Sequence, residues 1–257
     1  MTAAFIDAPA LAVPHGFFTR NGGVSVGPFA SLNCSLSGQD ARDNVLENRA
    51  RAVRALGAAP AALVGLTQVH GAETVVVREP WQLGAGPRAD ACVTDRPGVA
   101  LGIVTADCAP VLFADRRAGV VGAAHAGWRG AVLGILESTL AAMQRLGAQA
   151  GDVVAAVGPC IGQASYEVAA DLRDVVLAHD AEDSGFFCAG VRPDRWQFDL
   201  AGYCAARLRA AGIGSVVVTG CDTMADEARF FSHRRRTLAA VDGKMAPIGH
   251  QISVIRL

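Results

Sequence analysis

The chain has 257 residues, of which 51% are hydrophobic and 18% charged, and its formal net charge at pH 7 is -1. Its length and apolar content fit one large folded domain over residues 1–257, because no Ser-, Pro- or charge-rich linker divides it. A net charge near zero argues against nucleic acid or an anionic membrane as partner, so we expect a small-molecule partner.

The N-terminal residues do not resemble a secretory signal. They lack a basic segment and contain Asp7, Pro9 and Pro14, and no stretch approaches the roughly 18 apolar residues of a membrane span. The seven cysteines are scattered without CxxC pairs, which favours a reducing compartment with free or metal-bound thiols. We therefore expect a cytoplasmic protein that is a monomer or a weak homo-oligomer.

Before residue 60 the sequence predicts one loop and one helix. The Gly-rich run 19–25, which contains Arg20, is typical of a hairpin loop. Apolar residues recur at helical spacing over 43–56 and Gly57 follows as a stop, which predicts a helix there. Arg49 lies on this helix, in a position where arginines usually form a solvated face.

The centre of the chain predicts a β-hairpin that carries reactive side chains. Apolar runs of strand length cover residues 99–104, 111–113 and 120–124. A turn at 115–119 joins the last two runs, and the two ends of an antiparallel hairpin meet. Cys108 before its first strand and His125 after its second therefore become neighbours. A thiol beside an imidazole is either a metal site or a nucleophile with its base.

A further histidine precedes this hairpin. Residues 63–79 predict a strand, a bend and a second strand, with His70 at a strand end. His70 and His125 are each followed by Gly or Ala-Gly, which leaves room for a ligand. Two histidines and one cysteine bind zinc well, and an open fourth position is typical of a catalytic site. Zinc held by His70, Cys108 and His125 is one interpretation, and the cysteine nucleophile stays open beside it.

The second half of the chain mixes helices and strands without a regular βαβ repeat. Helices are predicted over 130–146, 167–179 and 200–211, and strands over 153–157, 215–219 and 252–257. We therefore expect an α/β protein with mixed sheets rather than a Rossmann or barrel fold. Neither GxGxxG nor GxxxxGK[ST] occurs, which argues against dinucleotide and P-loop sites.

Several blocks of the sequence resemble the signatures of one family. These blocks are residues 68–71, 105–110, 124–130, 158–162 and 230–235. In this order they resemble the YfiH/DUF152 family, long labelled polyphenol oxidase or laccase, which includes peptidoglycan editing factor. The resemblance extends from Thr19 to the C-terminus and implies a single-domain α/β sandwich of mixed sheets flanked by helices. It also implies zinc bound by His70, Cys108 and His125.

The same resemblance implies purine nucleoside chemistry. The implied reactions are phosphorolysis of adenosine, inosine, guanosine and methylthioadenosine, and hydrolytic deamination of adenosine. A three-ligand zinc ion lowers the pKa of bound water, which provides the hydroxide for deamination. Phosphorolysis needs an anion site, and guanidinium groups bind phosphate bidentately. The candidates for binding substrate or phosphate are Arg49, Arg129, Arg20, Arg234, Asn33 and Gln68.

Two alternatives use this chemistry differently. A cysteine hydrolase, for instance one that edits cell-wall precursor peptides, would use Cys108 as nucleophile and His125 as base, with Asp107 or Asp90 as orienting carboxylate. A polyphenol oxidase with several copper ions needs many histidines in HxH pairs. The chain has six histidines and no HxH, which disfavours copper. Asp107 and Cys160 could complete the site, or be an ordinary strand-end carboxylate and a buried thiol.

Overall fold

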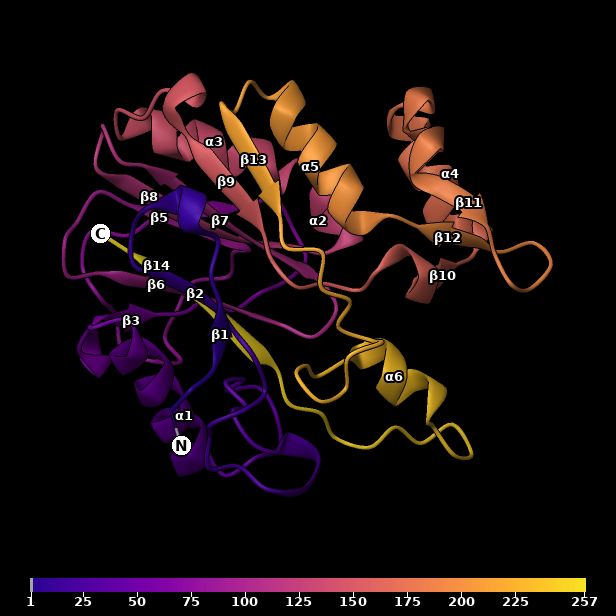
Figure 1. The fold of residues 1–257 in the computed structure, drawn as a ribbon, viewed down its shortest axis with the longest axis horizontal. Helices are drawn as coiled ribbons and strands as arrows, with labels where there is room; N and C mark the ends of the chain where they lie inside the picture. The colour runs from indigo at the N-terminus through magenta and orange to yellow at the C-terminus, as the bar shows by residue number, and fades with distance from the viewer. Residues whose placement is uncertain (1) are drawn as a thin grey trace.

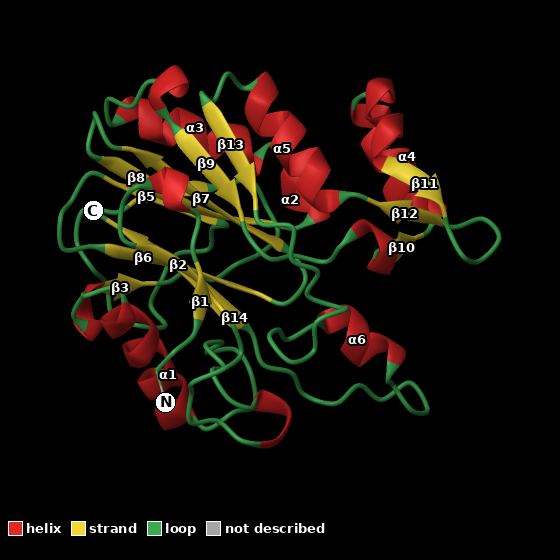
Figure 2. Ribbon diagram, viewed as in Figure 1, coloured by secondary structure: helices red, strands yellow, loops and turns green. Residues whose placement is uncertain are grey.

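The structure is a computed structural model that describes residues 2–257, and two large β-sheets with helices outside them form its body (Figures 1 and 2). The first sheet has the order β1 (Phe5–Ile6), β2 (His15–Phe18), β14 (Gln251–Arg256), β6 (Ala100–Thr105) and β3 (Leu63–Val64). The second has the order β13 (Ser215–Val218), β9 (Val154–Val157), β7 (Ala109–Asp115), β8 (Val120–Ala126), β5 (Ala91–Thr94) and β4 (Thr74–Val76).

Both sheets are mixed, as predicted. β3 runs parallel to β6 in the first sheet, and β4 and β13 run parallel to β5 and β9 in the second. The remaining pairs in the two sheets are antiparallel. The mixed α/β fold that the sequence predicts is therefore confirmed.

The two large sheets pack face to face over one core. Successive strand residues point to opposite faces. Leu112 of β7 accordingly packs with Leu101 and Ile103 of β6 between the sheets, whereas Val111 and Phe113 face the helices on the other side. Every residue of β7 and β8 is buried for this reason. The hairpin is thus a rigid support for the residues at its open end.

Helices cover the outer faces of the sheets. The helices α2 (Trp128–Val132), α3 (Ile135–Arg145) and α5 (Leu200–Ala210) cover the second sheet, and α1 (Arg42–Ala55) packs beside β6 and β14 of the first (Figure 1). A small unit at the right of Figure 1 consists of α4 (Ala170–His179) and the sheet β10 (Glu167–Val168), β12 (Trp196–Phe198) and β11 (Phe187–Ala189). The remaining helix, α6 (His233–Leu238), follows a long loop.

Short 3₁₀ helices occur in the connections at Pro9–Leu11, Gly27–Phe29, Pro60–Ala62, Ala150–Asp152, Gln163–Ser165 and Ala181–Phe186. Among residues 2–257, no helix combines the length and the apolar character needed to span a bilayer.

Two predicted helices were wrong in their limits. The helix expected over 130–146 is two helices, α2 and α3, because Gly134 between them has a left-handed φ of 90°. The helix expected over 167–179 begins only at Ala170, because Glu167 and Val168 pair with β12.

One predicted turn was also wrong, and His70 lies in a different setting from the one predicted. The run 19–25 is not a hairpin loop, because β2 ends at Phe18 and the next strand along the chain is β3. The two strands predicted on either side of His70 are present as β3 and β4, but they belong to different sheets. His70 therefore lies in the loop that crosses from one sheet to the other, and not at a strand end.

Candidate metal centre and substrate cavity

The β7–β8 hairpin brings Cys108 and His125 together. Ala109 pairs with Ala126 and Pro110 with His125, so both ends of the hairpin meet in register. Cys108 directly precedes β7, whereas His125 lies inside β8, one residue before its end, rather than after it. Since both strands are fully buried, the two side chains are held with little freedom.

His70 joins this pair from the crossing loop. One ligand atom from each of His70, Cys108 and His125 lies within 4.8 Å of the other two. The ring centroids of His70 and His125 are 4.7 Å apart, and the two rings make an interplanar angle of 78°. A tetrahedral zinc ion holds two such nitrogens and a sulfur roughly 3.3–3.6 Å apart, so a small inward shift suffices to form a site. The three residues fit a transition metal and leave a fourth position to a ligand.

A buried carboxylate holds two of these residues in place. Asp90 has no exposed surface, and its Oδ1 lies 2.8 Å from His125 Nδ1, which leaves the Nε2 atom of that ring for a metal. The backbone amides of Val69, His70 and Gly71 donate to the same carboxylate at 2.7–3.2 Å. Burial raises the pKa of Asp90, but the hydrogen bonds from His125 and the amides outweigh it and leave the pKa below its usual value.

Cys108 and His125 influence each other electrostatically. Burial opposes ionisation of the Cys108 thiol, but the attraction and hydrogen bonds of His125 and His70 prevail and lower its pKa to about 6. Burial likewise opposes protonation of His125, and the charge of Cys108 together with the Asp90 hydrogen bond raises its pKa to about 9. A thiolate is the form of cysteine that binds a metal or attacks a substrate.

The backbone around the centre is unusual at two positions. His70 has φ of 60° and Asp107 has φ of 90°, both in the left-handed region that residues other than glycine rarely adopt. Gly127 has an ordinary φ but no space beside it: a Cβ there would lie 3.0 Å from Cys108 Sγ and 3.2 Å from His70 Cδ2. Strained and close-packed backbone of this kind is common at functional sites.

A cavity of about 670 Å³ opens beside the three residues. Of the candidates for binding substrate or phosphate, Arg49, Gln68 and Arg234 line it, whereas Arg20, Asn33 and Arg129 are not in its wall. Gln68 is committed to the fold, because its amide nitrogen and oxygen bond both backbone groups of Val104 on β6 at 2.8 and 2.9 Å.

Arg49 is a buried cation that no carboxylate of residues 2–257 neutralises. The residue is only 4% exposed, contrary to the solvated face that its helix pattern indicates. Among the hydrogen bonds of residues 2–257, its guanidinium has one, from Nη1 to the Cys34 carbonyl at 2.8 Å, and its buried Nε has no partner. It forms no ion pair with a described residue. Burial lowers the pKa of Arg49, and the nearby Cys34 partly offsets this effect.

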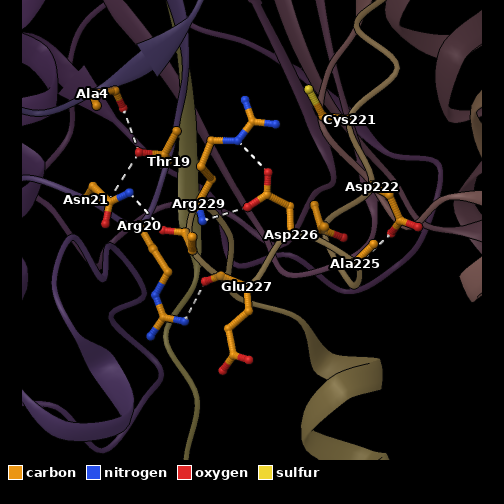
Figure 3. Close-up of polar contacts among 12 residues, drawn as sticks. Ala4, Thr19, Arg20, Asn21, Cys221, Asp222, Ala225, Asp226, Glu227 and Arg229 are labelled. Atoms are coloured by element: carbon orange, nitrogen blue, oxygen red, sulfur yellow. Dashed lines mark hydrogen bonds and ion pairs between the residues drawn. The ribbon is translucent and has the colours of Figure 1, made fainter.

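The other candidates have structural partners. Arg20 donates to the Ala30 carbonyl at 2.8 Å. It also donates to the Glu227 carbonyl at 3.2 Å, which holds the loop 221–229 against the N-terminal segment (Figure 3). Asn33 bonds Asp40 through its amide nitrogen, while its oxygen accepts two backbone amides. Arg129 is exposed, and its guanidinium carbon lies 5.0 Å from the centroid of the Trp128 ring.

Sequence reasoning missed several residues of the cavity wall. Arg42, Tyr166, His233 and His250 all line it. His233 lies inside the family block 230–235, which could have indicated it, whereas His250 stood in an ordinary loop context. The Cys160 thiol is buried in the core with α5, its pKa is raised by burial, and it does not line this cavity.

The fold and the site together define an α/β protein with a cluster of three candidate metal ligands at the end of a hairpin and a cavity of about 670 Å³ beside it. A sequence model of the family described as multi-copper polyphenol oxidoreductase laccase matches residues 14–257. The chain therefore belongs to this family, the YfiH/DUF152 family that the motif blocks resemble.

Proteins with similar sequences match this chain over most of its length. A protein of Deinococcus radiodurans named purine nucleoside phosphorylase is 46% identical over 233 residues, 90% of this chain and 87% of its own length. Purine nucleoside phosphorylase YfiH of Escherichia coli is 39% identical over 220 residues, 84% and 86% of the two chains. The crystal structure of Bacillus licheniformis YfiH is 32% identical, with a TM-score of 0.88 over 100% of this chain and 96% of that one.

Proposed function

We propose that this protein is a purine nucleoside phosphorylase that also deaminates adenosine, with zinc as its metal. The observation that carries the proposal is the buried, unneutralised guanidinium of Arg49 in the wall of the same cavity as the metal centre. The names of the relatives support the substrate class.

Arg49 has the properties of a phosphate site. A buried charge without a partner is costly, and an entering anion removes that cost. Phosphate suits it because guanidinium donates two parallel hydrogen bonds to such an anion. Gly65 leaves space for the guanidinium of Arg49, since a Cβ at position 65 would lie 2.6 Å from Arg49 Nη2.

One wall connects this group with the metal centre. Gly65 contacts Arg49, and the chain continues past Gln68 to His70, a run that spans at most roughly 18 Å. A nucleoside along this wall could meet Arg49 at one place and the His70 centre at another. Phosphorolysis joins a phosphate oxygen to ribose C1′ and breaks the C1′–N9 bond, and the leaving base takes up a proton.

Deamination would use the other end of the wall. His70, Cys108 and His125 would hold the zinc ion, which would supply a water of lowered pKa for attack at purine C6. The chain's own contribution is positional: Asp90 fixes His125 and the loop that carries His70. The close approach of Gly127 to Cys108 excludes other groups from that side.

Product analysis tests the proposal. The purified, metal-loaded protein is incubated with inosine or adenosine, with and without inorganic phosphate, and the products are separated by chromatography. We expect hypoxanthine and ribose 1-phosphate from inosine only with phosphate, and inosine from adenosine in either buffer. Release of free ribose without phosphate would contradict phosphorolysis.

Arg49→Gln tests the phosphate site. Loss of a charge-assisted hydrogen bond corresponds to about 1.5–3 kcal/mol, so we expect the phosphate KM to rise about 10- to 100-fold while deamination changes little. Arg129→Gln, at an exposed position of the same residue type, is the control. Circular dichroism verifies folding. If the two variants had equal phosphate KM values, Arg49 would not be the phosphate site.

The geometry also favours a second candidate, a cysteine hydrolase. Cys108, His125 and Asp90 are arranged in the order of a nucleophile, its base and an orienting carboxylate, and the pKa of Cys108 is low. Removal of metal with a chelator distinguishes the two candidates, because a thiolate nucleophile works without metal and the zinc-dependent deaminase does not.

A further inference from the structure

Asp107 connects the Cys108 turn to a distant part of the chain. Its carboxylate is 8% exposed and accepts three hydrogen bonds. Oδ1 accepts from Thr223 Oγ1 at 2.7 Å, and Oδ2 accepts from Ser232 Oγ at 3.0 Å and from the Arg234 amide at 2.6 Å. Thr223 and Ser232 lie in the segment that leads into α6, and Arg234 lies in the first turn of α6.

The backbone of Asp107 has a conformation that disfavours aspartate. With φ of 90°, the position favours glycine, and Asp is accepted there only at the expense of strain. Its carbonyl also accepts the Ile161 amide at 2.9 Å. Since glycine would fit the backbone better, the side chain itself must account for aspartate at this position.

Arg234 extends the connection into the cavity wall. Its amide is held by Asp107, and its Nη1 donates to the Glu167 carbonyl at 2.7 Å. Its guanidinium carbon lies 5.4 Å from the centre of the Tyr166 ring. Arg234 and Tyr166 both line the cavity that Cys108 also lines. Asp107 is the neighbour of Cys108 in the chain and bonds the amide of Arg234, whose guanidinium lies against Tyr166. Asp107 thereby connects Cys108 to the part of the cavity wall that Arg234 and Tyr166 form.

We propose that Asp107 is a positioning residue for the nucleoside reaction, which sets the Arg234–Tyr166 wall relative to Cys108 so that a purine base stacks on Tyr166. This proposal rests on the proposed function. Aromatic rings stack readily on bases, and their position fixes where a base meets the metal centre. The positioning role of Asp107 depends on its hydrogen bonds and not on its negative charge. An asparagine can offer its oxygen to Ser232 and Arg234 and its amide to the Thr223 hydroxyl, which can accept.

A matched pair of variants tests the proposal. Asp107→Gly suits the left-handed backbone but removes the three hydrogen bonds, whereas Asp107→Asn retains them. For Asp107→Gly we expect the KM for inosine to rise at least about 10-fold, with kcat changed less than about 3-fold and both metal content and melting temperature near those of the wild type. For Asp107→Asn we expect kinetic constants within about 3-fold of the wild type.

Three results from the kinetics and metal content of these variants would overturn the proposal. An unchanged KM in Asp107→Gly would mean that the wall does not depend on this side chain. Equal damage in the two variants would assign the effect to the negative charge. Loss of metal from Asp107→Gly would mean that the residue acts on Cys108 instead of the wall.

Hydrogen exchange separates this proposal from the proposed function. Amides of residues 232–238 should exchange at least about 10-fold faster in Asp107→Gly than in the wild type or Asp107→Asn, whether or not nucleosides are substrates. A wild-type enzyme without nucleoside activity would refute the proposed function and leave this readout intact. Unchanged exchange in Asp107→Gly would refute the positioning role itself.

Discussion

Asp90 illustrates how one buried carboxylate can organise the residues of a candidate metal site. Replacing Asp90 by Asn places an amide where donors from His125 and the 69–71 loop already point. We expect Asp90→Asn to lower metal affinity about 10- to 100-fold, because the ring of His125 and the loop of His70 lose their support. Competition with a chromogenic chelator measures this affinity.

The control for that variant is Asp95→Asn. Asp95 is a partly exposed carboxylate paired with Arg78 and Arg96, so the same substitution there should leave metal affinity unchanged. Equal affinities in Asp90→Asn and the wild type would show that the three ligands do not need Asp90.

The Cys108 thiol gives the metal-free protein a pH-dependent reactivity. Because its pKa is lowered to about 6, the thiolate dominates above that pH and is lost as the pH falls through it. We expect alkylation of Cys108 by iodoacetamide to rise with a midpoint near pH 6 after chelation, and bound metal to protect it. Peptide mass spectrometry measures the rate. A midpoint near pH 9 would contradict the thiolate–imidazolium pair.

At the scale of elements, the β7–β8 hairpin needs close packing where it ends. The Cβ of Gly127→Ala would press on Cys108 Sγ at 3.0 Å and on the His70 ring at 3.2 Å. We expect metal affinity and turnover to fall about 10-fold or more while the melting temperature changes by only a few degrees. Gly151→Ala, whose added Cβ meets nothing within 4 Å, is the matched control. A parallel fall in stability would indicate a structural role for Gly127.

The hairpin was predictable because the residues that define it are close together in the sequence. Apolar runs and a turn define β7 and β8, and the antiparallel register then places Cys108 beside His125. The crossing loop of His70 was not predictable in this way. Two short strands close in sequence suggest a local pair, and only the choice of partners β6 and β5 separates them into different sheets.

The arginines show a second limit of sequence reasoning. Motifs identified Arg20, Arg49 and Arg234, but the structure gives them different environments. Arg20 bonds carbonyls of two loops, whereas Arg49 is buried beside the cavity and has no counter-ion among the described residues. Such partners lie far away in sequence, so helical spacing indicated a solvated Arg49. The contribution of Arg42 to the cavity had no local signal either.

At the scale of the whole molecule, the two large sheets should unfold together, because they share the core around Leu112. Leu112→Ala removes a fully buried side chain. We expect it to lower the free energy of unfolding by about 2–5 kcal/mol and to lower the midpoint temperature of a single calorimetric transition. Leu133→Ala, at a leucine that is 65% exposed, should shift that transition very little. Two separate transitions, with only one shifted by Leu112→Ala, would mean that the sheets are independent units.

The place of β14 also affects how the protein is made. This strand inserts between β2 and β6, although those two strands are synthesised long before it. Until Gln251–Arg256 leave the ribosome, a nascent chain carries two unpaired strand edges and an uncovered apolar face. A chain that lacks β14 would therefore expose edges to which other chains can add strands, and a chaperone that masks strand edges would protect it from aggregation.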